Sequence, residues 1–262
     1  MLRARVVRQT AMAVCLSFVA ATAFAQTKPK PYKPESGQAG KDVVWVPTPQ
    51  PLVEKMLDLA KVTPKDVVMD LGSGDGRTVI TAARRGATAI GVEFNPDMVQ
   101  LSRTNAKEAG VSGKATFIEG DLFKADLSKA TVITMFLLPQ INLKLRPQIL
   151  ELKPGTRIVS NSFNMDDWEA DQTEQVTENC TSWCTALLWI VPAKVEGTWT
   201  TPQGELVLKQ NFQMVTGTLA GQAISDGRLR GDQFTFTAGG TKHTVTVNGN
   251  SMQGSNWKAT KK

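Results

Sequence analysis

The chain has 262 residues, of which 41% are hydrophobic and 21% charged, and this ordinary composition excludes wholesale disorder and collagen-like repeats. Its formal charge is +6, but three arginines within the first eight residues account for half of that charge, which leaves +3 for the rest. The remainder carries no dense Lys/Arg stripe, so no nucleic-acid partner is expected.

Residues 1–25 have the order of features that is typical of a secretory signal peptide. Three arginines precede a short apolar run that ends in Ala23-Phe24-Ala25, directly before Gln26. The run is too short to span a membrane comfortably, so we expect cleavage after Ala25 and an exported, periplasmic or secreted protein without a stable membrane span. The alternative is an uncleaved anchor, which would still place the rest of the chain outside the cytoplasm.

The next residues, 26–41, form a lead-in that is rich in proline and lysine and is predicted to be extended and flexible. Over 42–193, short apolar runs alternate with helical stretches, which is typical of an α/β fold with a Rossmann-like, doubly wound, mostly parallel sheet. The expected strands are 67–71, 87–93, 115–119, 131–136, 156–160 and 186–191. The expected helices are 52–60, 78–85, 96–110 and a stretch over 141–152 that is broken at Pro147.

The segment 70–76, Asp-Leu-Gly-Ser-Gly-Asp-Gly, joins the first expected strand to a helix. Its glycines permit positive φ angles and a close approach of backbone to ligand. The free amides at the start of the following helix favour a carboxylate or a phosphate. Arg77 stands where the dinucleotide fingerprint has its third glycine or alanine, and the chain contains no P-loop motif, so this segment fits NAD and nucleoside triphosphates poorly.

Acidic residues lie at the ends of three successive expected strands. Glu93 ends the second expected strand, about twenty residues after the glycine loop, where a carboxylate can accept hydrogen bonds from ribose hydroxyls. Asp121 follows the third strand and can accept from an adenine amino group, while Asp70 suits a cationic ligand. S-adenosylmethionine carries all three groups, so the sequence predicts this cofactor.

From about Ala193 the sequence pattern changes to alternating β-forming residues separated by turn signals. Residues 194–262 are therefore predicted to form a small all-β domain, an antiparallel meander or barrel of about six strands. Trp199 and Trp257 flank it and are expected to close one core. The turn signals are Pro202-Gln203-Gly204, Asp226-Gly227, Gly239-Gly240 and Asn248-Gly249.

Two cysteines lie beyond the signal peptide, Cys180 and Cys184. An oxidising compartment permits a disulfide between them, and a pair of buried free thiols is the alternative. With His243 as the single histidine, they do not make a metal site, and no metal is expected.

Because of the motif at 70–76 and the acids at the strand ends, residues 42–193 resemble the class I, seven-strand methyltransferases. Three further stretches, Val46-Pro47-Thr48-Pro49, 136–139 and 152–160, are similar to a family of protein-lysine N-methyltransferases from archaea and mitochondria. The resemblance implies a cofactor site made by Thr48, Asp70, Gly72, Ser73, Gly74, Glu93, Asp121 and Leu122. It further implies that Leu138 and Pro139 wall the methyl group and that Asn161 and Phe163 border the substrate channel.

The sequence therefore predicts an S-adenosylmethionine-dependent methyltransferase that acts on a protein lysine. A small-molecule acceptor is the alternative substrate, and an exported binding module without turnover is the alternative function. Three acids, Asp166, Asp167 and Glu169, lie near the expected channel, but none is singled out as a base. Trp168 between them is predicted to be either core or channel wall.

Overall fold

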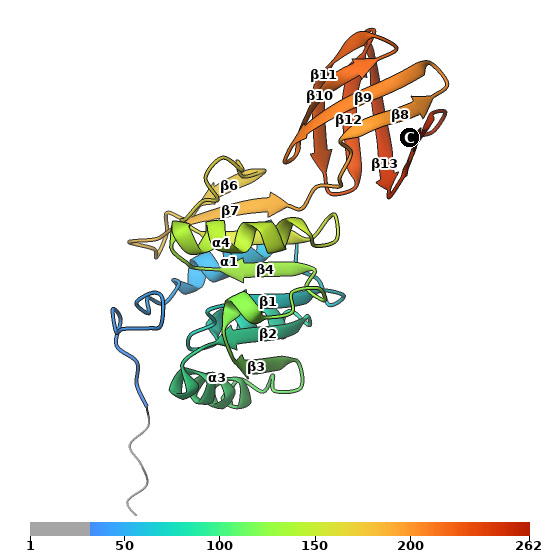
Figure 1. Cartoon of the computed structure of the whole chain (residues 1–262). Helices are drawn as coiled ribbons and strands as arrows, with labels where there is room; N and C mark the ends of the chain where they lie inside the picture. The colour runs from blue at the N-terminus through green and yellow to red at the C-terminus, as the bar shows by residue number, and fades with distance from the viewer. Residues whose placement is uncertain (1–31) are drawn as a thin grey trace, which may run out of the picture. The chain divides into compact units, whose positions relative to one another are not determined.

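The computed structural model describes residues 32–262, so the predicted signal peptide and the start of the lead-in lie outside the described residues. Lys33–Lys262 form one unit by their internal contacts. Two β-sheets account for its strands, a seven-stranded sheet flanked by helices and a closed antiparallel barrel (Figure 1). The predicted fold class is confirmed.

The seven-stranded sheet has the strand order β3-β2-β1-β4-β5-β7-β6. Its strands are β1 (Val67–Leu71), β2 (Thr88–Glu93), β3 (Ala115–Glu119), β4 (Val132–Met135), β5 (Arg157–Asn161), β6 (Gln172–Gln175) and β7 (Thr185–Ile190). The first five strands pair in parallel, whereas β7 runs antiparallel to both β5 and β6. The carboxyl ends of β1, β2 and β4 therefore meet at one edge of the sheet.

Helices cover both faces of this sheet. α1 (Gln50–Leu59), α2 (Arg77–Arg84) and α3 (Pro96–Glu108) share one apolar core with one face, and α4 (Pro139–Leu150) packs on the other (Figure 1). The alternation of side chains along each strand produces the two cores, with Val68 and Val132 facing the first and Met69 and Ile133 the second. Among the described residues, no helix has the length and apolar character needed to cross a bilayer.

The sheet and its helices differ from the prediction in two details. α4 is one continuous helix that contains Pro147. The proline removes a single backbone donor, and burial of Ile141, Leu145 and Ile149 against the sheet outweighs that loss. The polar edge strand β6 was not predicted, because its sequence Gln-Thr-Glu-Gln has no hydrophobic alternation.

The barrel contains eight strands, where about six were expected. They are β8 (Gly197–Thr201), β9 (Gly204–Asn211), β10 (Met214–Leu219), β11 (Gln222–Arg230), β12 (Gln233–Ala238), β13 (Thr241–Asn248), β14 (Ser251–Gln253) and β15 (Lys258–Lys261). The expected turn at Asp226-Gly227 is instead a bulge inside β11, where the pairing register shifts on both sides. Pairing of Lys261 with Trp199 closes the barrel, and Trp199, Phe234 and Phe236 fill its interior.

Candidate functional site

A cleft lies at the carboxyl ends of β1, β2 and β4, where ligands bind in open α/β sheets. Residues at the ends of these strands line it. Residues 38–48 also line it, and they belong to the segment 37–48, which we call the strap. The backbone of the strap turns back on itself, since the amide of Gly37 donates to the carbonyl of Trp45 at 2.7 Å.

The glycine loop after β1 is held in a left-handed path on the end of β2. Gly72, Gly74 and Gly76 have φ angles of 76°, 52° and 82°. The amides of Gly72 and Ser73 donate to the carbonyl of Val92 at 2.9 and 3.0 Å. A Cβ on Gly74 would lie 2.5 Å from Trp45 Nε1 of the strap, so this position accepts only glycine without rearrangement.

Asp70, near the end of β1, is a buried carboxylate facing the cleft, and its side chain accepts a hydrogen bond from Thr134 Oγ1 at 2.6 Å. Burial raises the pKa of Asp70 to about 7; the nearby Asp75 and Glu93 add to this rise, and the hydrogen bond from Thr134 opposes it. A cation placed in the cleft would restore the ionised form.

Glu93, at the end of β2, organises the loop around it. Its Oε2 accepts from the amide of Gly74 at 2.9 Å, and its Oε1 accepts from the amide of Asn95 at 2.9 Å. A carboxylate oxygen has more than one lone pair, so these bonds leave capacity for ribose hydroxyls. The side chain therefore positions the loop and lines the cleft at the same time.

Asp121 lies after β3, at the far end of the cleft, together with Phe94 and Leu122. Lys41 of the strap reaches this group: its Nζ lies 2.8 Å from Asp121 Oδ2 and 4.7 Å from the centroid of the Phe94 ring. The hydrogen bond to Lys41 lowers the pKa of Asp121, and the same bond raises the pKa of Lys41. An exposed aromatic ring beside a carboxylate is suited to bind adenine. In this structure the Lys41 side chain lies in that position.

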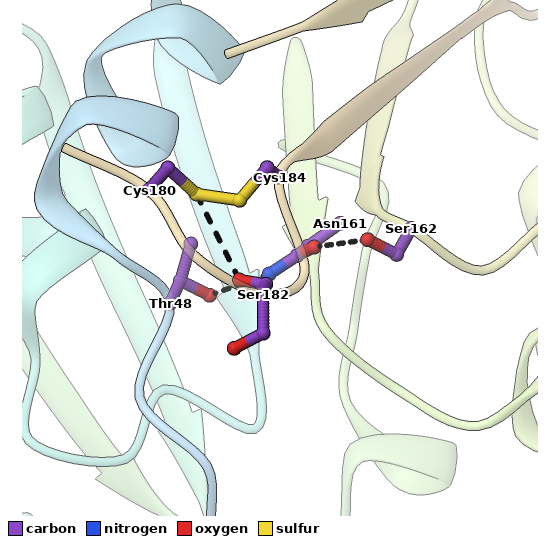
Figure 2. The surroundings of a disulfide bond; sticks show 6 residues. All are labelled: Thr48, Asn161, Ser162, Cys180, Ser182 and Cys184. Atoms are coloured by element: carbon purple, nitrogen blue, oxygen red, sulfur yellow. Dashed lines mark hydrogen bonds between the residues drawn. A yellow bond between two sulfur atoms is a disulfide. The ribbon is translucent and has the colours of Figure 1, made fainter. Parts of the chain in front are cut away.

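Thr48 lines the cleft and contacts Asn161 at the end of β5, which is fully buried and does not line the cleft. Asn161 Nδ2 donates to Thr48 Oγ1 at 3.3 Å, and the Thr48 carbonyl accepts from Arg77 Nη1 at 2.9 Å. Figure 2 shows this pair in the surroundings of a disulfide between Cys180 and Cys184. The disulfide settles the alternatives for the two cysteines, whose Cα atoms are 5.9 Å apart.

The residues after β4 differ in whether they line the cleft. Phe136 and Leu137 line the cleft, whereas Leu138 is half-buried outside it and Pro139 is exposed at the first position of α4. Phe163 is half-buried and stacks on Phe136, with ring centroids 5.9 Å apart. The roles of Leu138 and Pro139 therefore stay predictions, and Phe136 joins the set of candidates.

The three acids near the expected channel are all exposed. Asp167 forms an ion pair with Arg146. Trp168 is fully buried and packs against Trp189 and Phe212, so it belongs to the core rather than to a channel wall. Within residues 32–262, no group of three acidic, histidine or cysteine side chains is arranged to hold a metal ion.

The residues at the cleft fit S-adenosylmethionine. Asp70 would hold its cationic methionine part, Glu93 the ribose, and Asp121 with Phe94 the adenine. Ser73 also lines the cleft; its hydroxyl is buried beside Gly91 of β2 and has no hydrogen-bond partner among the described residues.

Cleft residues that sequence reasoning missed include Trp45 and Lys41 in the strap, Phe94 after β2 and Phe136 after β4. Phe94 had a signal, because it directly follows the acid that ends the second expected strand. The two strap residues had none, since their contacts join segments about 30 and 80 residues apart in the chain.

Comparison with known proteins agrees with this geometry. Residues 70–172 match the ANTKMT methyltransferase domain model. The chain is 44% identical over 139 residues to a protein-lysine N-methyltransferase from Saccharolobus islandicus, covering 52% of this chain and 86% of that protein. It is 38% identical to the adenine nucleotide translocase lysine N-methyltransferase of Mus musculus, covering 45% of this chain and 52% of that protein, so it spans about half of that relative.

A crystal structure described as an RNA methyltransferase from Salinibacter ruber in complex with S-adenosyl-L-homocysteine is also similar, with 50% identity and a TM-score of 0.54. The alignment covers 57% of this chain and 96% of that one. The glycine loop, the acids at the strand ends and the extensive match to the Saccharolobus enzyme lead to one conclusion: the chain belongs to the protein-lysine N-methyltransferase family.

Proposed function

We propose that this chain transfers a methyl group from S-adenosylmethionine to the side-chain amine of a lysine in a protein. The observation that carries the proposal is the 44% identity over 86% of a protein-lysine N-methyltransferase. The cleft supports it, because three carboxylates at the ends of β1, β2 and β3 match the three parts of the cofactor.

S-adenosylmethionine, when bound, supplies a methyl group that its sulfonium has already activated. The protein's contribution is alignment and exclusion of water. Asp70 and Glu93 would fix the cofactor from one side, while Phe136 and Leu137 form an apolar wall at the end of β4. Buried Asn161 and Thr48 hold the neighbouring loop and strap together, which keeps the entrance for an acceptor in a fixed shape.

The test supplies methyl-labelled S-adenosylmethionine and the purified protein to an extract of the host. We expect label in protein, and acid hydrolysis is expected to release it as methylated lysine. The Asp70→Asn variant is the matched control, because it removes the charge that would hold the cofactor.

Three other outcomes would contradict the proposal. Label confined to small molecules would indicate a small-molecule acceptor. Label in nuclease-sensitive material would indicate an RNA acceptor, in line with the description of the Salinibacter protein. If S-adenosylhomocysteine binds but no label is transferred to any acceptor, the chain is a binding module without turnover.

We also propose that the protein is exported. The order of features in residues 1–25 motivates this proposal, and the Cys180–Cys184 disulfide supports it, because such bonds persist in oxidising compartments. Sequencing the N-terminus of protein isolated from its host is expected to start at Gln26. An N-terminus at Met1 together with free thiols would contradict export.

Lys41→Met is expected to strengthen binding of S-adenosylhomocysteine by about twofold to fivefold. In the wild type, Lys41 pairs with Asp121 and lies over Phe94, so adenine must displace it. Calorimetric titration measures the change, and the advantage of the variant is expected to shrink at high salt, where the ion pair of the wild type is screened. Weaker binding by the variant would show instead that Lys41 contacts the bound cofactor.

A further inference from the structure

Three aromatic side chains from three separate segments meet beside the cleft. They are Phe136 at the end of β4, Phe163 after β5 and Trp183 between β6 and β7. Their ring centroids are 5.9 Å apart for Phe136–Phe163, 5.8 Å for Phe136–Trp183 and 5.2 Å for Phe163–Trp183. We call this group the aromatic cluster.

The cluster connects the cleft to solvent. Phe136 lines the cleft, whereas Trp183 is 44% exposed, which is unusual for so large an apolar side chain. An acceptor that approached the end of β4 from this side would therefore pass along aromatic rings. Because the three rings already touch one another, only their outer faces are available to a ligand.

The position of Trp183 is constrained by its backbone and by the disulfide. Its φ is 57°, a left-handed conformation that is a genuine outlier for a bulky residue and persists only when its surroundings enforce it. Cys180 and Cys184 close the loop that contains it. The loop is anchored further where the amide of Val176 donates to the carbonyl of Cys184 at 2.9 Å.

The segment that carries two of the three rings has a net negative charge. The segment 158–193 carries two of the three rings and contains six acidic residues but no lysine, arginine or histidine. Asp167 and Asp171 have arginine partners, and the other four acids are exposed or half-buried. A negatively charged segment favours an alkylammonium group over a polyanion such as RNA.

We propose that the outer face of the aromatic cluster receives the alkylammonium head of the acceptor lysine, and that the Cys180–Cys184 disulfide holds Trp183 in place for this contact. The proposal rests on the proposed function and deepens it. Aromatic faces attract cations, and quaternary ammonium groups bind to them well because they are weakly hydrated. The cluster is therefore expected to bind methylated lysine more tightly than a neutral side chain of the same shape.

The test compares two probes on protein saturated with S-adenosylhomocysteine, with binding followed by ligand-observed NMR. One probe is Nα-acetyl-trimethyllysine methylamide, and the other is its neutral isostere with carbon in place of the quaternary nitrogen. Wild type is expected to bind the cationic probe about threefold to tenfold more tightly. Trp183→Ala is expected to abolish this preference, Trp183→Phe to retain most of it, and the pair Cys180→Ser with Cys184→Ser to behave like Trp183→Ala.

Val207→Ala, which shortens an exposed apolar side chain of the barrel, is the control and is expected to change nothing. Equal binding of the two probes to wild type, no measurable binding of the cationic probe, or a preference that survives Trp183→Ala would overturn the proposal. Tighter, Trp183-dependent binding of a short oligouridylate would overturn it in favour of RNA.

Failure of this proposal and failure of the proposed function are distinguishable. If S-adenosylhomocysteine does not bind, or if extract labelling gives no methylated lysine, the proposed function fails. If both succeed and the two probes bind alike, only the role of the aromatic cluster fails. Unchanged affinity for S-adenosylhomocysteine in each variant shows that the cleft has remained folded.

Discussion

Replacing Asp70 with asparagine is expected to weaken binding of S-adenosylmethionine by about 30-fold to 300-fold, the cost of truncating one partner of a buried charge pair. The side chain is buried at the end of β1, and the substitution retains its shape and an acceptor for Thr134 Oγ1 while removing the negative charge. Calorimetric titration of both proteins at pH 8 measures the difference. Equal affinities would show that this carboxylate does not hold the cationic part of the cofactor.

The pH dependence of binding provides a sharper version of the same prediction. Burial raises the pKa of Asp70 to about 7, so below that pH most unliganded molecules carry a neutral acid. A cationic ligand favours the carboxylate, so binding near pH 6.5 is expected to release a fraction of a proton, visible as a dependence of the calorimetric heat on the ionisation enthalpy of the buffer. Affinity of the wild type is expected to rise from pH 6 to pH 8, whereas Asp70→Asn binds weakly at every pH.

Stability is expected to respond in the opposite direction. Because the pKa of Asp70 is higher in the folded than in the unfolded state, its contribution to folding is fully present below about pH 4 and is lost as the pH rises through about 7. At pH 8 the unliganded Asp70→Asn protein is therefore expected to have a higher Tm than the wild type. A variant that binds more weakly but unfolds at higher temperature cannot have lost binding through misfolding.

Much of the α/β sheet could be predicted because its signals are local. Val67–Leu71 is an apolar run followed by glycines, and Asn95-Pro96 predicts the start of a helix that does begin at Pro96, with the Asn95 side chain accepting from the amide of Asp97. The acids Glu93 and Asp121 were found by the same logic, since each follows a strand.

The features that escaped prediction depend on distant contacts. Lys41 reaches Asp121 across 80 residues, and Trp183 owes its position to a disulfide and to rings on two other strand ends. The bulge at Asp226-Gly227 has the local sequence of a turn, and only pairing with both neighbouring strands keeps it inside β11. Local patterns carry no information about such contacts, so the aromatic cluster and the strap emerged only from the folded chain.

Gly74→Ala is expected to lower affinity for S-adenosylhomocysteine by about tenfold or more. An alanine at φ 52° is strained by about 1–2 kcal/mol, and its Cβ would lie 2.5 Å from Trp45 Nε1. The loop can relieve both by moving away from the strap, which breaks the hydrogen bond from the Gly74 amide to Glu93. Because cofactor binding requires the original loop position, binding must overcome this strain. Calorimetry measures the strain energy as lost affinity.

Two controls separate strain from crowding. Gly110→Ala introduces a Cβ at a φ of 70° with nothing within 4 Å, so it is expected to lower the free energy of unfolding and leave affinity unchanged. Combining Gly74→Ala with Trp45→Ala removes the collision but keeps the backbone strain, and the double variant is expected to recover part of the lost affinity, relative to Trp45→Ala alone. If adding Trp45→Ala restores none of the affinity, the strap does not constrain the loop. The loss of affinity then comes from backbone strain alone.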